Sequence, residues 1–310
     1  NTEIGIRLSN DMALGETDFE LMGMSGNNVK ILLDGIPLID RGATKQSLSQ
    51  LDVNSIERVE IVEGPMSVVY GTDALAGVIN IITKKGDGYS EENTWRVGAR
   101  VQEESMGKEY DFFKDKGLHN ESIDLGFNHK SGLFVNGGYT RNNHGGWQGD
   151  LTGREKRWHP KDQALMNGMF GFQNRNMNVW YRLDFLDEKI FGPNNGSELQ
   201  PEKVSDKDFL TKRYTHQLQS DWKLDNRLDV HAALSYQDYK RRTRTTESDL
   251  STGEKWLSSA EASQDITQYK AWIARATVAW NIAPEFSVQP GVEYQWTQGG
   301  GGRIDGTPKV

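Results

Sequence analysis

The chain has 310 residues, a net charge of −8 at neutral pH and no cysteine. The acidic balance argues against a nucleic-acid partner, and without cysteine neither a disulfide framework nor a thiolate metal site can form. Mean hydropathy is −0.69. The chain opens without a signal-peptide pattern and contains no run of about 18 apolar residues, so no membrane-spanning helix is expected. A membrane β-barrel remains a possible fold, because only every second residue of its strands must be apolar.

The first 86 residues have the pattern of a small domain. Residues 1–27 mix apolar residues with turn formers and predict short, mixed elements. Three apolar runs follow, rich in Val and Ile and bounded by Gly, Pro, Asn or charge, and each predicts a strand buried in a small core. They are Val29–Leu33, Val59–Val62 and Val78–Ile82.

Turn and helix signals separate these runs. Asp34-Gly35 closes the first run with a residue pair that tolerates positive φ. One helical turn is expected over Ser47–Leu51. A second is expected over Pro65–Tyr70, because Pro suits the first position of a helix and Gly71 would stop it. The polar stretch at residues 86–93 is expected to be a linker.

Two pieces of this region, LLDGIPL and IERVEIVEGPMSVVYGTDALAGVINIITK, resemble the plug domain of TonB-dependent outer-membrane receptors. Two departures weaken the expectation of local salt bridges between plug and barrel. Glu63 stands where many members carry Arg, and Leu21-Met22-Gly23 stands where many carry Ile-Arg-Gly. The motif positions to which the resemblance assigns a structural role are Asp34, Gly35, Arg58, Gly64, Pro65, Tyr70, Gly71, Gly77 and Asn80.

The resemblance implies an α+β plug domain inside an all-β antiparallel transmembrane barrel, with about 22 strands in the full protein. It implies a plug over residues 1–88 without its N-terminal part, where the family carries the short box that binds the energy-coupling partner. Residues 89–310 are then the first portion of the barrel, without its C-terminal part. The chain is therefore expected to be a fragment of a larger receptor.

From Thr94 onward, apolar and polar residues alternate over about ten residues at a time, the length that a tilted strand needs to cross a bilayer. The apolar face is expected to meet lipid, and the face rich in Arg, Gln, Asn, Asp, Glu and Lys is expected to line the bore. The nine predicted strands are Thr94–Glu104, Ser122–Lys130, Leu133–Arg141, Gln163–Gln173, Met177–Asp187, Leu210–Trp222, Arg227–Lys240, Tyr269–Asn281 and Phe286–Gln298.

The connectors between these strands alternate between short and long, as in bacterial outer-membrane barrels. Long loops of roughly 17–28 residues are uncommon in compact soluble domains. Gln298–Val310 is expected to open a further outer loop. The short links are Ser131-Gly132, Asn174–Asn176, Lys223–Asn226 and Ile282–Glu285, and the long ones are Ser105–Glu121, Asn142–Asp162, Glu188–Phe209 and Arg241–Gln268.

The resemblance implies a receptor in the outer membrane of a Gram-negative bacterium that imports a large, scarce nutrient, driven by the TonB–ExbB–ExbD energy complex. The expected cargo is a ferric siderophore, haem or cobalamin, so iron, haem or cobalt would arrive with the ligand. No enzymatic activity and no resident cofactor are expected. A glycan importer of the same family is the main alternative, a passive porin or adhesin is a weaker one, and a soluble β-rich hydrolase lacks a visible catalytic set.

Candidate ligand contacts lie in the predicted outer loops. Aromatic rings there could stack on a haem, corrin or sugar ring, against the alternatives of loop packing or a girdle at the membrane interface. The two histidines could meet a metal or haem, against the alternative of solvated side chains. These candidates are Tyr110, Phe112, Phe113, Trp147, His144 and His159.

Three charged groups complete the candidates. An acidic outer-loop cluster, Glu198, Glu202, Asp206 and Asp208, is considered for Ca²⁺, although its spacing matches no known calcium loop. Arg241-Arg242 with Arg244 lies just above a strand end and could contact lipopolysaccharide or simply be solvated. On the plug, Glu57, Arg58, Glu60 and Glu63 are expected to pair with Arg and Lys of the barrel wall.

Overall fold

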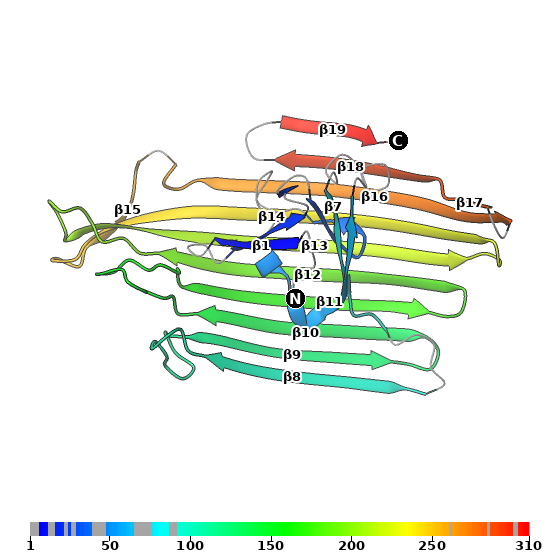
Figure 1. The fold of residues 1–310 in the computed structure, drawn as a ribbon, viewed down its shortest axis with the longest axis horizontal. Helices are drawn as coiled ribbons and strands as arrows, with labels where there is room; N and C mark the ends of the chain where they lie inside the picture. Colours follow the sequence, from blue (N-terminus) through cyan, green and yellow to red (C-terminus); the bar gives the residue numbers. More distant parts are fainter. Residues whose placement is uncertain are drawn as a thin grey trace.

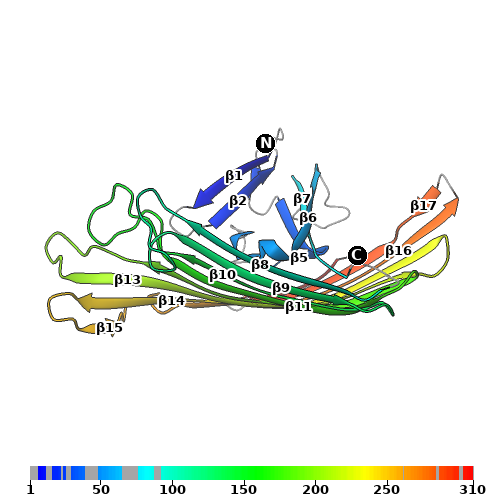
Figure 2. The same cartoon turned by 90° about the horizontal axis from the view of Figure 1, so that it is seen from below.

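The computed structural model describes residues 6–11, 16–21, 24–25, 29–38, 48–64, 76–86, 92–260, 262–283, 286–299 and 303–309. Two small sheets, which we call the plug, sit on the concave face of a large curved sheet, which we call the wall (Figures 1 and 2). No helix in the described ranges is long and apolar enough to cross a membrane.

The plug consists of a three-stranded and a four-stranded sheet. The four-stranded sheet has the order β5-β4-β7-β6, in which β4 and β7 are parallel and the other pairs are antiparallel. Its strands match the three predicted runs. The elements are β1 (Ile6–Asp11), β2 (Glu16–Leu21), β3 (Met24–Ser25), β4 (Val29–Leu33), β5 (Ile36–Pro37), the 3-10 helices η2 (Leu48–Gln50) and η3 (Val53–Ser55), β6 (Ile56–Glu63) and β7 (Gly77–Thr83).

The described part of the plug contains two short helices. The turn predicted over Ser47–Leu51 is present as η2. Within the described residues there is no α-helix, and the helical part of the predicted α+β plug consists there of the two 3-10 helices. The turn predicted over Pro65–Tyr70 lies outside the described residues, as does the predicted domain boundary at residues 88 and 89.

The prediction that all three plug strands are buried is wrong for β6. Strands β4 and β7 form the buried core of the sheet, but Val59 of β6 is 50% exposed and Ile61 and Val62 are also exposed. The reason is position in the sheet. Strand β6 is at the edge, so it pairs on one side only, and no described layer covers it.

The wall is a 12-stranded antiparallel sheet whose main path runs from β8 to β19 in chain order, with β15 paired to β14 and β17 paired to β16 (Figure 1). Each strand on the path pairs with the strand before it, as expected for a barrel wall. The strands are β8 (Thr94–Glu104), β9 (Leu118–Asn128), β10 (Leu133–His144), β11 (Lys161–Gln173), β12 (Met177–Gly192), β13 (Lys203–Lys223), β14 (Leu228–Asp249), β15 (Lys255–Leu257), β16 (Ile266–Ala283), β17 (Phe286–Val288), β18 (Gly291–Gly299) and β19 (Arg303–Lys309).

The predicted alternation of the wall is confirmed on its outer face. Trp95 and Val97 are 76% and 71% exposed there, and comparable apolar residues follow on each strand. The inner face is more mixed than predicted. Gln237 is fully buried on it, as a polar bore residue, but so are the apolar Trp180 and Leu186. Apolar residues are tolerated at inward positions because the plug shields them from water.

Several boundaries differ from the prediction. Strands β13 and β14 reach 21 and 22 residues and extend far into the predicted long links. Strands that pair outside a membrane need no apolar side chains. The alternation of apolar and polar residues therefore ends before the paired strands β13 and β14 do. The predicted ninth strand is divided into β17 and β18 before Pro290, which has no N–H to donate to a neighbouring strand. Residues 303–309 form β19, where a loop was predicted.

The turn between β9 and β10 lies close to the end of β11, and this close approach can be tested by substitution of a glycine. A Cβ at Gly132 (φ +96°) would lie 2.0 Å from the carbonyl oxygen of Gln173, whereas a Cβ at Gly253 (φ +78°) would meet nothing within 4 Å. Gly253→Ala should cost only the positive-φ strain, about 1–2 kcal/mol. Gly132→Ala should lower the free energy of unfolding by clearly more, measured by urea unfolding of the intact protein in detergent. Equal losses would contradict the close approach at Gly132.

Candidate functional site at the plug–wall contact

The first contact is built from the hairpin of β4 and β5. Asp34 and Gly35 both have positive φ and close a two-residue turn, so the backbone folds sharply back. The Asp34 carboxylate accepts hydrogen bonds from the Thr83 N–H (2.9 Å), the Thr83 hydroxyl (2.6 Å) and Lys85 Nζ (2.7 Å). The Gly35 N–H donates to Asn80 Oδ1 at 2.9 Å. The turn is thereby fastened to strand β7.

Wall side chains satisfy the carbonyl groups that this hairpin leaves open. These wall side chains face inward and come from β13, β14 and β16. Because a buried carbonyl without a donor is costly, this row holds the hairpin in one place. Gln217 donates to Leu33 O (3.2 Å), Gln219 to Asp34 O (2.7 Å), Gln237 to Pro37 O (2.7 Å) and Arg275 to Gly35 O (2.7 Å).

The segment 48–55 makes the second contact. Gln50 is buried, donates through Nε2 to Glu188 Oε1 at 2.8 Å, and accepts at its carbonyl from Arg213 Nη2 at 2.7 Å. Glu188 is also bound by Gln163 Nε2 (2.8 Å) and Lys161 Nζ (3.2 Å). One plug amide therefore closes a network shared by three wall strands.

Glu188 lies beyond the apolar band of β12, because its outward-facing neighbours Asp187 and Lys189 are charged. Burial raises the pKa of Glu188, but the charge of Lys161 and the hydrogen bonds from Gln50, Lys161 and Gln163 outweigh burial, so that the pKa is lowered overall. The carboxylate is therefore ionised at neutral pH and accepts from Gln50 as a charged group, which strengthens the bond.

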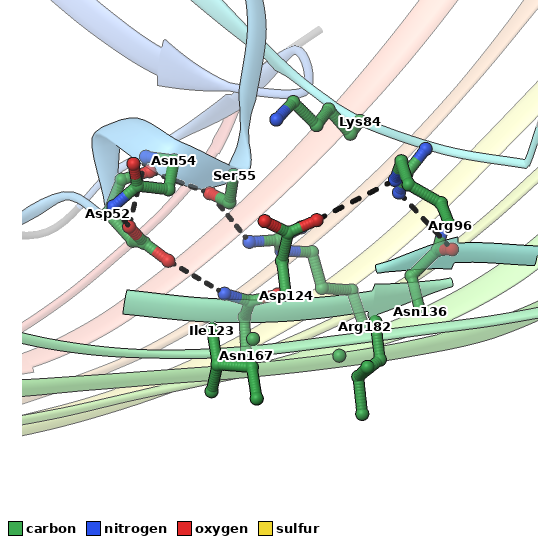
Figure 3. A pocket seen from close by; sticks show the side chains of 13 residues that line it. Asp52, Asn54, Ser55, Lys84, Arg96, Ile123, Asp124, Asn136, Asn167 and Arg182 are labelled. Atoms are coloured by element: carbon green, nitrogen blue, oxygen red, sulfur yellow. Dashed lines mark hydrogen bonds and ion pairs between the residues drawn. The ribbon is translucent and has the colours of Figure 1, made fainter. Parts of the chain in front are cut away.

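The helix η3 makes the third contact (Figure 3). Asp52 caps this helix by accepting from the Asn54 N–H, and it also accepts from the Thr140 hydroxyl and Asn167 Nδ2, both at 2.9 Å. Ser55 Oγ accepts from Arg182 at 3.2 Å. A polar cavity of about 20 Å³ lies beside these groups, a size that fits one water molecule.

Together these contacts form a seam of hydrogen bonds. Apolar side chains lie beside it: Ile36 packs with Ala233 and Ile273, and a small cavity is lined by Leu33, Leu38 and Leu51 of the plug and Leu165 and Leu186 of the wall. Each hydrogen bond contributes only about 1 kcal/mol net, since water can replace either partner. Such a seam holds the plug in one position and can still be opened step by step. No group of three or more His, Cys, Asp or Glu in the described part of the chain is arranged to hold a metal ion.

Within the described residues, no salt bridge joins β6 to the wall, so the expected pairing of β6 with Arg and Lys of the wall is not found there. Arg58 pairs with its own neighbours Glu57 (3.0 Å) and Glu60 (2.9 Å), and all three are exposed. The wall is contacted instead by the hairpin and the segment 48–55, which lie nearer to it than β6 does. Gly64 ends β6 with positive φ, and Pro65, Tyr70 and Gly71 lie outside the described residues.

The predicted ligand-binding aromatics of the first outer loop lie on the outer side of the wall. Tyr110 donates to Glu103 Oε2 at 3.1 Å, and His119 binds the same oxygen at 2.7 Å. Glu103 and His119 share the outward parity of Val97 and Val101. Phe112 and Phe113 are exposed and meet edge to face at 4.4 Å. A ligand role for these rings stays a prediction, and this orientation does not favour it.

The two histidines of the second outer loop have different surroundings: His144 is buried, whereas His159 is half-buried. The His144 ring lies 4.2 Å from the Trp158 ring, and its Nδ1 accepts from the Gly146 N–H at 2.8 Å. Trp147 pairs with Trp158 through two backbone hydrogen bonds. His159 lies beside Gly192 of β12. Whether these side chains contact a ligand stays a prediction.

Two members of the acidic cluster, Asp206 and Asp208, have basic partners. Asp206 forms two hydrogen bonds with Arg154, at 3.0 and 2.7 Å, and Asp208 pairs with Arg244 and Lys189. Of the three arginines considered together, Arg241 faces inward and lies 4.4 Å over the Phe209 ring. Only Arg242 is an exposed cation without a described carboxylate partner.

Sequence reasoning missed the wall donors that hold the hairpin. A signal was present, because Gln217 and Gln219 alternate with outward-facing residues of one predicted strand. Their partners are backbone carbonyls, however, which leave no trace in the sequence. Gln50 was missed for another reason, since it lies in a turn whose contact with the wall depends on the packing of distant segments.

Known proteins can now be compared with this geometry. Residues 1–78 match the sequence profile of a family described as "TonB-dependent Receptor Plug Domain". An iron-regulated outer membrane virulence protein of Vibrio cholerae serotype O1 is 40% identical over 80 residues, covering 22% of this chain and 12% of the relative. The vitamin B12 transporter BtuB of Vibrio vulnificus is 40% identical over 79 residues, covering 26% of this chain and 13% of the transporter.

Solved structures extend the likeness to the wall. The ferric yersiniabactin uptake receptor FyuA of Yersinia pestis aligns with a TM-score of 0.60 at 14% identity, over 96% of this chain and 53% of the receptor. The pyoverdine receptor FpvA of Pseudomonas aeruginosa PAO1 aligns with a TM-score of 0.59 at 15% identity, over 96% and 53%. At such identities the likeness shows the fold alone. The chain spans about half of each solved receptor, and its match covers a far smaller share of the curated relatives.

A plug on the concave face of an antiparallel, apolar-out wall is the fold that this chain shares with the solved receptors FyuA and FpvA. Residues 1–78 match the plug domain of TonB-dependent receptors. The strands that follow have the fold of part of a receptor barrel wall. Within the described residues the wall does not close on itself.

The buried Asp52 predicts how strongly the seam resists opening. Asp52→Ala should leave the Thr140 hydroxyl and the Asn167 amide without their acceptor, at a cost of about 1–3 kcal/mol. We expect faster proteolytic cleavage of the plug in the intact, detergent-solubilised protein. The matched control is Glu57→Ala, which removes an exposed plug carboxylate that binds only Arg58 among the described contacts. Equal cleavage rates for the two variants would exclude Asp52 as a seam contact.

His144 predicts a pH-dependent outer loop. Burial lowers the pKa of His144 to about 4, and the charges of Lys161 and His119 act in the same direction. The opened loop, with an ordinary histidine pKa, therefore binds an extra proton as the pH falls. Stability of the loop should be complete above about pH 6.5 and decrease between about pH 6.5 and 4. Hydrogen exchange of residues 145–160, corrected for intrinsic rates, should rise over this range in the parent and less in His144→Gln.

Proposed function

We propose that the intact protein is a receptor in the outer membrane of a Gram-negative bacterium that imports a large, scarce nutrient by an energy-coupled step. The observation that carries this proposal is the hydrogen-bonded seam. A plug fused to its wall by an apolar core could not be moved without unfolding, whereas a polar seam exchanges its partners with water. The proposal is for transport and not for catalysis.

The proposed cargo is a ferric siderophore, with haem or cobalamin as further candidates. Support comes from what the similar proteins are named for, namely ferric yersiniabactin uptake, pyoverdine binding and vitamin B12 transport. Any iron, haem or cobalt would then belong to the cargo. We do not extend the proposal to calcium, because Asp206 and Asp208 already have basic partners.

The proposed partner is the TonB–ExbB–ExbD energy complex, which would act on the plug from the periplasmic side. The plug hydrogen bonds lie on separate elements, the hairpin, η2 and η3. A directed pull could therefore break them in succession, and each step would cost far less than releasing the whole contact at once. Oligosaccharide import by the same mechanism is a second candidate. A passive porin is disfavoured by the plug seated in the bore.

The seam can be locked by a cross-link to test this function, and residues 1–310 contain no native cysteine. Asn54 Nδ2 lies 3.1 Å from Thr140 Oγ1, so cysteines at these two positions can be bridged by a short bis(methanethiosulfonate) cross-linker, which forms a reducible disulfide with each thiol as methanesulfinate leaves. We expect the bridged receptor to bind a ferric siderophore, haem or cobalamin but not to import it, and a reductant should restore uptake by whole cells.

The single-cysteine variants, treated with the same reagent, are the controls and should import normally. A protonophore should stop uptake in every variant, because the step is energy-coupled. Uptake that continues under the protonophore or in the bridged receptor would show a passive pore, and transport of oligosaccharides alone would favour the second candidate.

A further inference from the structure

A cluster of three basic side chains lies on the outer face of the wall. Lys212 of β13 is directly opposite Lys240 of β14, and Arg242 follows one step further from the apolar band, opposite Leu210. All three occupy positions with the outward parity of Tyr214 and Leu234. We call Lys212, Lys240 and Arg242 the outer cationic cluster.

The charge of this cluster is only partly balanced. Lys212 pairs with Asp187 at 3.2 Å. The next carboxylate along β14, Asp238, is engaged by Gln268 (2.8 Å) and Lys270 (3.9 Å). Among the described residues no carboxylate pairs with Lys240 or Arg242, and both are exposed. Like charges directly opposite in an antiparallel pair are destabilising, so this arrangement favours an anion between them.

The position of the cluster relative to the apolar band indicates which anion. On each strand the band ends in an aromatic residue, Phe185 on β12, Tyr214 on β13 and Tyr236 on β14. The rings of Phe185 and Tyr214 lie 4.8 Å apart, and Tyr236 lies beside His216 of β13 and Trp272 of β16. Aromatic belts of membrane proteins lie at the level of the lipid headgroups. Lys212 and Lys240 follow within two to four residues, on the side of the long loops, where the phosphates of the outer leaflet would lie.

We propose that Lys212, Lys240 and Arg242 bind the phosphate group of an outer-leaflet lipid, whose acyl chains lie against Leu218 and Leu234. Ammonium and guanidinium groups bind phosphate through charge-assisted hydrogen bonds, and the exposed leucines continue the lipid-facing band. The inference rests on the proposed membrane location and not on the cargo, because the site is on the opposite face of the wall from the bore.

The test is lipid retention by the intact receptor. Parent and Lys240→Gln/Arg242→Gln receptors are purified in a zwitterionic detergent, and binding of bisphosphorylated lipid A is measured by native mass spectrometry. Each basic residue near an anionic membrane surface contributes about fivefold to binding. We therefore expect the double variant to bind bisphosphorylated lipid A about 30-fold more weakly than the parent does. Lipid A without its phosphates should bind the parent and the double variant equally weakly.

The matched control is Lys130→Gln/Lys223→Gln, which removes the same charge at the short-turn end of the wall and should bind like the parent. Heat-modifiable mobility verifies folding of each variant. Equal binding by all variants, or displacement of the lipid by millimolar inorganic phosphate, would overturn the lipid assignment. Cargo uptake by the variants is measured separately, and its failure in the parent would count against the proposed function and not against this site.

Discussion

The structure depends on one constraint, which is that the buried backbone of the plug must find its hydrogen-bond partners in the wall. A tight hairpin turns its carbonyl groups outward, and against the concave face of the wall these groups are buried. The amides of Gln217, Gln219 and Gln237 and the guanidinium of Arg275 take that place. Because each of these hydrogen bonds requires a particular direction between donor and acceptor, together they fix the orientation of the plug.

The alternation of each wall strand separates three environments. Inward positions meet the plug, outward positions near the middle form an apolar band, and outward positions beyond that band carry charge. Strand β13 contains all three, with Gln217 inward, Leu218 in the band and Lys212 beyond it. A shift of one residue in register would exchange the first two environments along the whole strand. The hydrogen-bonded register is therefore as important to the seam as the glutamines themselves.

Local patterns predicted much of this fold. The turn at Asp34-Gly35 and the start of β8 at Thr94 follow from signals within a few residues, and the structure agrees with both. The sequence was less informative about exposure and orientation of side chains that depend on segments distant in the chain. The exposure of Val59 depends on the order of strands in the plug sheet. The outward orientation of Tyr110 depends on Glu103 and His119, which lie on two different strands.

Asp34 connects the hairpin of β4 and β5 to the end of β7. This connection determines how a movement of the hairpin is passed to the rest of the plug. Its carbonyl accepts from Gln219 of the wall, while its carboxylate holds Thr83 and Lys85 at the end of β7. Lys85 in turn lies 5.1 Å over the ring of Trp180. A displacement of the hairpin that breaks the Gln219 bond therefore acts on the residue that anchors the chain where it leaves the plug sheet. The turn and the exit segment must move together, or the buried carboxylate must give up its donors.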